Sequence, residues 1–172
     1  MTGARSVTRG EPSTMTGNPA FVVARARSGE FRLSDAGGAD RASMTVFGIA
    51  TGAEIRTGSG SLTAARDGWR TVNAAYQGDP GRWIRLDPRD SRLPGDTVVP
   101  EWEIHRRWRY YEGTLHSLRR SMTLRLAPFS GRRCTVDIDG DWNDVEAVAL
   151  TACYALLVRR KLDQIITVTA GH

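Results

Sequence analysis

The stretch that decides the fold is residues 147–158, AVALTACYALLV, which is apolar at every position except Thr151. Its residues favour helix, and a helix that is apolar on every face has to be covered on all sides. At about 1.5 Å per residue the run spans roughly 18 Å, and it is shorter than the ~20 residues that cross a bilayer. The stretch therefore predicts a core helix and not a membrane span.

The flanking residues indicate where this helix begins and ends. Asp141 and Asn143 precede it with side chains that cap helices, and residues 159–161 (Arg-Arg-Lys) follow it with cations that the helix dipole favours. Asn143 and Glu146 have the spacing of a capping box. We expect a helix from about residue 143 to 161, with Asp141 or Asn143 as its N-cap.

The chain before the helix has the pattern of short strands. Eleven runs of β-type composition lie between Ala20 and Ile138, separated by residues that favour turns. The clearest turn signals are residues 35–38, 67–68, 78–81 and 93–96. A long antiparallel sheet has to close or cover its edges, and an all-apolar helix needs an apolar wall. We therefore expect a mainly β fold, a closed antiparallel barrel of about 11–12 short strands around the central helix.

Length and composition predict one globular domain. The chain has 172 residues, of which 40% are hydrophobic and 25% charged, which excludes wholesale disorder. Residues 1–19 are small and polar and predict a flexible N-terminal tail, which leaves residues 20–172 for the barrel domain. No signal-like apolar stretch opens the sequence, and Cys153 falls inside the buried run. We expect both cysteines to be reduced and the protein to be cytoplasmic.

Residues 134–162, CTVDIDGDWNDVEAVALTACYALLVRRKL, carry a family resemblance. An acidic, glycine-containing strand end leads into a helix of the form D-x-x-A-x-x-x-A-x-x-x-L, which resembles the end of the LURP-one-related and phospholipid scramblase domains. RDGWR at residues 66–70 is similar to the strand-and-turn repeats of the same superfamily. The resemblance implies a bacterial-type member with the tubby C-terminal-like fold. The chain lacks the proline-rich region, cysteine cluster and extra apolar span of eukaryotic scramblases, so we expect no lipid scrambling.

Four aspartates in this segment, Asp137, Asp139, Asp141 and Asp144, raise a calcium hypothesis. Ca²⁺ binds carboxylate oxygens, and the similar scramblases are described as binding calcium near this position. The spacing departs from an EF-hand, because glycine is fourth in the loop instead of sixth and Val148 is twelfth. The alternative is that the aspartates shape a turn and cap the helix. Calcium binding stays open at this stage, and we assign no metal ligand.

A basic and aromatic segment, residues 105–111 (HRRWRYY), is the main candidate binding site. A predicted hairpin places the next arginine pair on an adjacent strand, where guanidinium groups from both strands would bind phosphates. The residues assigned to this anion- and lipid-binding site are Arg106, Arg107, Arg109, Arg119 and Arg120.

Strand alternation supplies a second interpretation of the same segment. In this interpretation Trp108 and Tyr110 point into the barrel, while Arg107 and Arg109 are solvated and pair with glutamates on the outer face. The sequence alone leaves both interpretations open.

A formal net charge of +5 and a pI of about 9.9 favour an anionic partner. We expect a non-enzymatic protein that associates reversibly with anionic phospholipid headgroups, peripheral at the membrane. A protein-interaction scaffold or regulatory domain without a lipid ligand is the alternative. Nucleic-acid binding comes third, because no reader module is recognisable. No metal-site, hydrolase or nucleotide-binding motif occurs, so we expect no cofactor.

Overall fold

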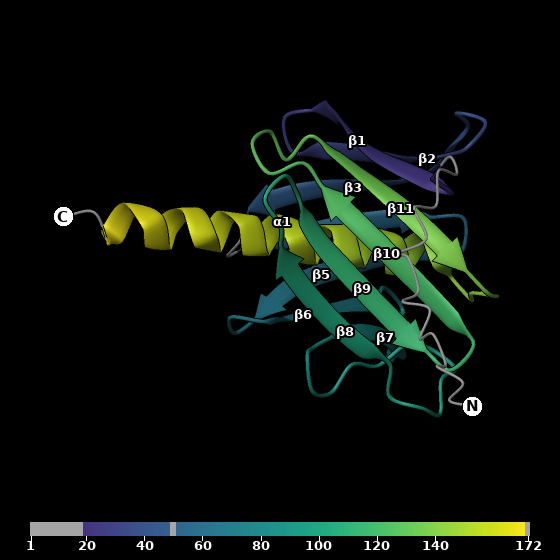
Figure 1. The fold of residues 1–172 in the computed structure, drawn as a ribbon. Helices are drawn as coiled ribbons and strands as arrows, with labels where there is room; N and C mark the ends of the chain where they lie inside the picture. The colour runs from purple at the N-terminus through teal and green to yellow at the C-terminus, as the bar shows by residue number, and fades with distance from the viewer. Residues whose placement is uncertain (1–18, 49–50, 171–172) are drawn as a thin grey trace, which may run out of the picture.

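A computed structural model describes residues 19–48 and 51–170, and it contains an antiparallel sheet curled around one helix (Figure 1). The elements are β1 (Phe21–Arg27), β2 (Glu30–Asp35), β3 (Asp40–Gly48), β4 (Gly52–Thr57), β5 (Gly60–Asp67), β6 (Thr71–Tyr76), β7 (Asp79–Leu86), β8 (Glu101–Arg106), β9 (Tyr111–Ser117), β10 (Arg120–Leu126), β11 (Arg133–Asp139) and α1 (Val145–Thr169). The predicted fold class is confirmed. Of the predicted tail, all but Pro19 lies outside the described residues.

The eleven strands form one sheet in the order β7-β6-β5-β4-β3-β2-β1-β11-β10-β9-β8. Every neighbouring pair is antiparallel, including β1 with β11, which joins the first strand to the last. Strand direction alternates along this order, so with an odd number of strands the two edges, β7 and β8, run in the same direction. The two edge strands therefore cannot pair with each other in the antiparallel pattern of the rest of the sheet. The barrel is nearly closed, and we call the gap between β7 and β8 the seam.

The core lies between the inner face of the sheet and α1. Side chains alternate along the strands, and in β4, for example, Ala53 and Ile55 are buried while Arg56 is exposed. Every residue of α1 from 147 to 156 is buried. The one polar residue in this stretch, Thr151, donates a hydrogen bond from Oγ1 to the carbonyl of Ala147 at 2.7 Å. The prediction of a fully covered core helix is therefore confirmed.

The start of the helix differs from the prediction. The N-cap is Asp144, with φ of 52° and no side-chain cap hydrogen bond, so the predicted caps Asp141 and Asn143 are wrong. The carboxylate of Asp144 instead accepts a hydrogen bond from Arg82 of β7. A charge-assisted hydrogen bond is stronger than a neutral one, and this one ties the helix start to the barrel wall.

The helix also ends later than predicted. It runs to Thr169, eight residues past the predicted end at residue 161. The cations at 159–161 favour a C-terminus but do not stop a helix, and neither glycine nor proline occurs at residues 162–169. The last part of α1 therefore projects from one end of the barrel, which we call the exit end (Figure 1). The opposite end, where α1 begins, is called the far end.

Gly113 of β9 marks a close contact inside the barrel. A Cβ at this position would lie 2.6 Å from Cη2 of Trp102 and 3.3 Å from Cδ2 of Leu156. The Trp102 ring, 1% exposed, therefore occupies the space that a larger residue at 113 would need.

The first prediction tests this packing. Gly113→Ala should lower the free energy of unfolding by about 1–3 kcal/mol, because overpacking forces the indole or the helix to move. Gly58→Ala is the control, since a Cβ there meets nothing within 4 Å and its φ is not positive. Urea unfolding measures both variants, and equal stabilities would contradict the packing described here.

The second prediction concerns the two thiols. Cys134 of β11 and Cys153 of α1 are free and buried, and contact with the Cys153 thiol, together with burial, raises the pKa of Cys134. Iodoacetamide reacts with thiolates. Both cysteines should therefore be alkylated only when the barrel unfolds, so the rate should rise with urea in parallel with the unfolded fraction. Rapid alkylation without urea, followed by mass spectrometry, would show that the helix is accessible.

Candidate functional site

The five arginines assigned to a binding site do not lie together. Arg106 ends β8, and Arg107 and Arg109 lie in the turn between β8 and β9. Arg119 and Arg120 lie beyond the other end of β9. The seven residues of β9 separate the two groups by about 23 Å at ~3.3 Å per residue. The strands are adjacent as predicted, but successive turns of an antiparallel meander lie at opposite ends of the barrel.

At the far end, the side chain of Arg120 is engaged in contacts within the protein. Its guanidinium donates to the carboxylate of Asp96 and lies 4.7 Å from the ring centroid of Trp142. The side chains of Arg120 and Asp96 are only 14% and 13% exposed. Arg120 therefore anchors the segment before β8. Of Arg119 and Arg120, only Arg119 is freely exposed.

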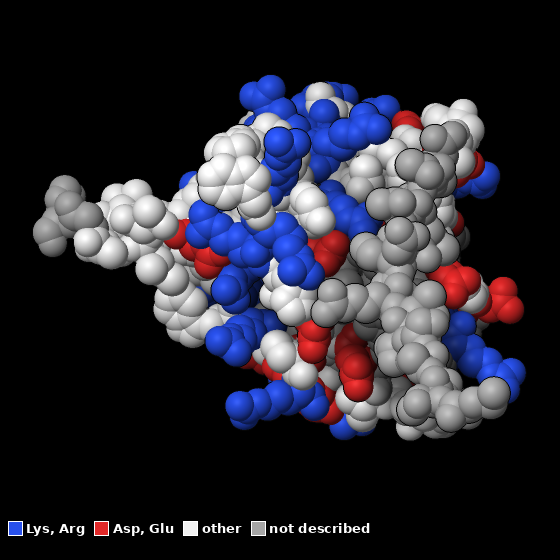
Figure 2. Space-filling model, in the orientation of Figure 1, with Lys and Arg blue, Asp and Glu red and all other residues white. Residues whose placement is uncertain are grey.

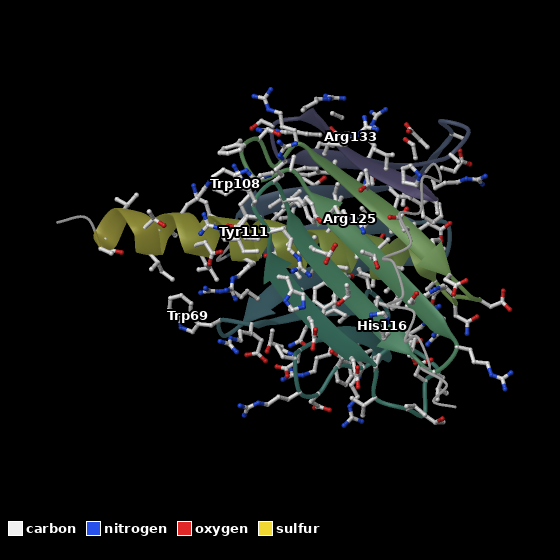
Figure 3. The ribbon with its side chains drawn as sticks, viewed as in Figure 1. Trp69, Trp108, Tyr111, His116, Arg125 and Arg133 are labelled. Atoms are coloured by element: carbon white, nitrogen blue, oxygen red, sulfur yellow. The ribbon has the colours of Figure 1, made fainter. Side chains whose placement is uncertain are left out.

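At the exit end, four exposed aromatic residues occupy the loops and strand ends. We call Phe47, Trp69, Trp108 and Phe129 the aromatic rim, and they are 62%, 65%, 90% and 91% exposed. Trp108 and Phe129 line one depression together with Arg106, Arg107 and Arg109. Figure 3 shows Trp69 and Trp108 close to the place where α1 leaves the barrel.

The projecting end of α1, residues 162–169, is called the helix tail. Trp69 lines a small depression with Leu162 and Ile166 of the tail, so the rim and the tail are neighbours. Ile165, Ile166 and Val168 are 50%, 50% and 68% exposed. Within residues 19–48 and 51–170, no helix has both the length and the hydropathy to cross a membrane.

Polar contacts fix the base of the helix tail against the barrel. Tyr111 of β9 donates from Oη to Asp163 at 3.0 Å, and Arg159 donates from Nε to the other carboxylate oxygen at 3.1 Å. Burial, followed by the hydrogen bond to Asp163, raises the pKa of Tyr111. Arg160 donates to the carbonyls of Pro128 and Phe129 at 2.6 and 2.9 Å. The tail and the β10–β11 loop therefore have a defined relative position.

The cations of the exit end are only partly neutralised. Arg107 pairs with Glu112 at 3.2 Å, whereas Arg106 and Arg109 form no ion pair in the part of the chain that the structure describes. Figure 2 shows basic side chains gathered around the base of the projecting helix and over the upper edge of this face. The exit end therefore combines available positive charge with exposed aromatic surface.

The alternation-based interpretation of this segment is wrong for Trp108. β8 ends at Arg106, so the period-two pattern stops there and Trp108 lies in a turn, 90% exposed. Arg107 pairs with Glu112 of β9 and not with the glutamates of β8. The environments of Trp108 and Arg107 therefore depend on where the turn begins, which the alternation pattern did not reveal.

The acidic residues before α1 are dispersed among other contacts. Asp137 pairs with Arg125 at 2.9 Å, and Asp144 pairs with Arg82. Among the described residues, no three His, Cys, Asp or Glu side chains come together as a potential metal site.

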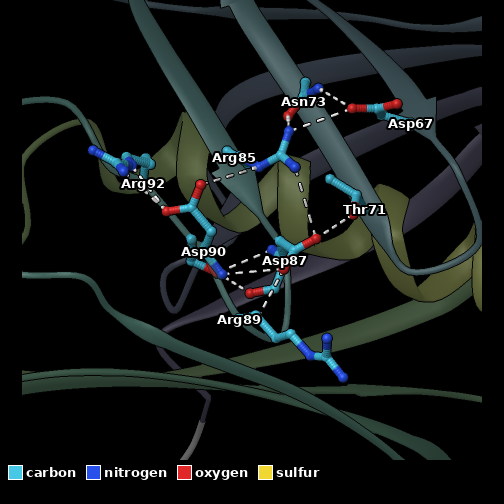
Figure 4. A network of polar contacts seen from close by, with 9 residues as sticks. Asp67, Thr71, Asn73, Arg85, Asp87, Arg89, Asp90 and Arg92 are labelled. Carbon is cyan, nitrogen blue, oxygen red and sulfur yellow. Dashed lines mark hydrogen bonds and ion pairs between the residues drawn. The ribbon is translucent and has the colours of Figure 1, made fainter.

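A polar network holds the segment that crosses the seam (Figure 4). Arg85 of β7 contacts Asp67 and Asn73 at 3.3 Å and Asp87 at 3.8 Å. Asp87 accepts hydrogen bonds from Thr71 and from the backbone N–H groups of residues 89 and 90, the latter two at 2.8 and 3.1 Å. The start of the segment that connects β7 to β8 is therefore fixed to β6.

Comparisons with family models, with curated proteins and with solved structures found no match to this chain.

The third prediction follows from the Asp87 contacts. The hydrogen bond from Thr71 and the two backbone donors lower the pKa of Asp87 below its ordinary value of 3.8. A folded-state pKa below the unfolded one stabilises the protein at neutral pH, and this contribution is lost as the pH falls below about 4. Asp87→Asn should lower the free energy of unfolding by about 1–3 kcal/mol at neutral pH. The difference from wild type should shrink as the pH falls.

Asp139→Asn is the control for this experiment, because Asp139 is exposed and its carboxylate forms no hydrogen bond within the described residues. Urea unfolding across a pH series measures all three proteins. A difference between wild type and Asp87→Asn that stays constant down to acid pH would contradict the role of the Asp87 carboxylate.

Proposed function

We propose that this protein associates reversibly with membranes that contain anionic phospholipid, and that the exit end is the contact surface. The observation that carries the proposal is that the aromatic rim, the exposed apolar residues of the helix tail, and Arg106 and Arg109 occupy the same end of the barrel. Neither arginine forms an ion pair among the described residues. Tryptophan settles at the headgroup level of a bilayer, and arginine binds phosphate. The three features together suit a surface that is anionic outside and apolar a few ångströms below.

The physical chemistry of such an association has two parts. Each arginine close to an anionic leaflet contributes about 1 kcal/mol, and the attraction fades over a Debye length of ~8 Å at physiological salt. Rim aromatics and tail residues such as Ile165 and Val168 add apolar area that enters the headgroup boundary. Charge brings the protein to the surface, and the apolar side chains hold it there.

The resemblance of residues 134–162 to phospholipid scramblase and LURP-one-related domains supports the same class of ligand. That support is independent of the exit end, because it rests on the strand end and the buried helix. Arg119 and Arg120 are not part of the proposed contact, since they lie at the far end.

The fourth prediction tests the proposed contact. The wild-type protein should sediment with vesicles of phosphatidylcholine and phosphatidylglycerol at low salt, less at high salt, and little with phosphatidylcholine alone. Changing Arg106, Arg107 and Arg109 together to alanine should weaken binding by about 100-fold, which is the loss of about 3 kcal/mol. Trp108→Ser with Phe129→Ser should weaken binding even at low salt.

Matched controls come from the far end. Arg119→Ala removes one exposed cation, and Leu118→Ser removes an apolar side chain that is 85% exposed. Both should bind vesicles like wild type. Equal losses at the two ends would contradict the exit end as the contact surface, and no sedimentation at low salt would contradict lipid binding altogether. Gel shifts with single- and double-stranded DNA across the same salt series test the nucleic-acid alternative.

A further inference from the structure

The seam between β7 and β8 contains a cavity of about 260 Å³. It lies where the sheet does not close, and α1 forms its back wall through Ala155 and Val158. Because the missing ladder leaves a gap in the barrel wall, the cavity reaches the helix from the outside. An engineered cavity of about 150 Å³ is large enough for benzene, so this space holds a somewhat larger molecule.

The inner wall of the cavity is apolar. Val72, Trp102, Ala155 and Val158 line it and are between 1% and 5% exposed. These residues come from β6, β8 and α1, three elements that the core packing holds in place. Small-molecule sites are mostly apolar and largely preformed, with a few polar groups that orient the ligand.

The mouth of the cavity is polar and carries more positive than negative charge. Arg70 is exposed, lines this cavity and the neighbouring depression, and forms no ion pair among the described residues. Arg159 also lines both, and donates to Asp163 at 3.1 Å. Glu103 is the acidic residue at the mouth, and His105 contacts its carboxylate at 3.0 Å. Arg70 is therefore the cation available to an incoming anion.

Trp102, which lines the same wall, carries a buried polar atom. Nε1 of Trp102 is buried and has no hydrogen-bond partner among the described residues. Most buried donors in native proteins have an acceptor, supplied by protein, water or ligand. Nε1 exposes almost no surface to the cavity, so the apolar wall and Arg70 are the features that define the ligand of this site.

We propose that the seam cavity binds a small amphipathic carboxylate, with its apolar body against α1 and its carboxylate at Arg70. A medium-chain carboxylate has an apolar body to match the inner wall and one negative charge to match the guanidinium of Arg70. The site adjoins the lipid contact proposed above, because Trp69 of the aromatic rim also lines the cavity. It differs from that contact in admitting a single dissolved molecule without a bilayer.

The experiment uses octanoate and octan-1-ol as probes, below their aggregation limits and without vesicles. Isothermal titration and intrinsic tryptophan fluorescence measure binding to the full chain. Wild type should bind octanoate with a Kd near or below about 1 mM. Arg70→Ala should weaken octanoate binding about tenfold and leave octan-1-ol binding unchanged, because it removes only the partner of the carboxylate.

Two further variants separate the cavity from general charge effects. Ala155→Leu fills the back wall and should abolish binding of both probes, with circular dichroism confirming that the barrel is folded. Arg133→Ala removes an exposed arginine of β11, away from the seam, and should bind octanoate like wild type (Figure 3).

Three outcomes would overturn the proposal: no binding of octanoate to wild type, undiminished binding to folded Ala155→Leu, or equal losses in Arg70→Ala and Arg133→Ala. Because Arg70→Ala changes an exposed residue, it tests the proposal even if Ala155→Leu does not fold. Vesicle binding by the same variants is measured separately, so failure of this site is distinguishable from failure of the membrane contact.

Discussion

The structure depends on the burial of a helix that is apolar all the way round. From residue 147 to 156 every side chain of α1 is buried, so the helix has no face that it can turn to water. One sheet layer covers half of such a helix, whereas a curled sheet covers all of it. Full burial of a leucine-sized side chain contributes about 1.5–3 kcal/mol, and Leu150 and Leu156 are both fully buried. The strands therefore wrap around α1, and the helix in turn fills a barrel that would otherwise be hollow.

The number of strands has a consequence for the surface. Eleven strands that alternate in direction leave two edges that run the same way, so the antiparallel ladder stops at β7 and β8. The protein covers part of this gap with the segment after β7, which the network of Arg85 and Asp87 fixes to β6. The remaining gap is the cavity that reaches α1. The same wrapping that stabilises the helix thus leaves a route by which a small molecule can approach it.

The two ends of the barrel differ because the helix leaves through one of them. At the far end, Arg82 pairs with Asp144 and Arg120 with Asp96, while Arg119 is exposed. At the exit end, loops surround a helix tail that has no further strand to cover it, and apolar residues such as Phe129 and Val168 stay exposed. Exposed apolar surface on this scale is typical of a binding surface. The neighbouring Arg106 and Arg109, which form no ion pair among the described residues, are the basis for proposing an anionic partner.

The sequence by itself determined the buried helix, the approximate positions of the strands and the barrel, because apolar run length, period-two alternation and turn residues are local signals. It did not determine that Arg106 and Arg120 lie at opposite ends, that Trp108 is exposed, or that α1 continues to Thr169. Nor did it identify Trp69 as a neighbour of the helix tail or Phe129 as a partner of Arg160. Those facts depend on where each strand stops and on which loops the sheet gathers at each end. Only the tertiary structure decides them, because residues distant along the chain become neighbours when the sheet closes around the helix.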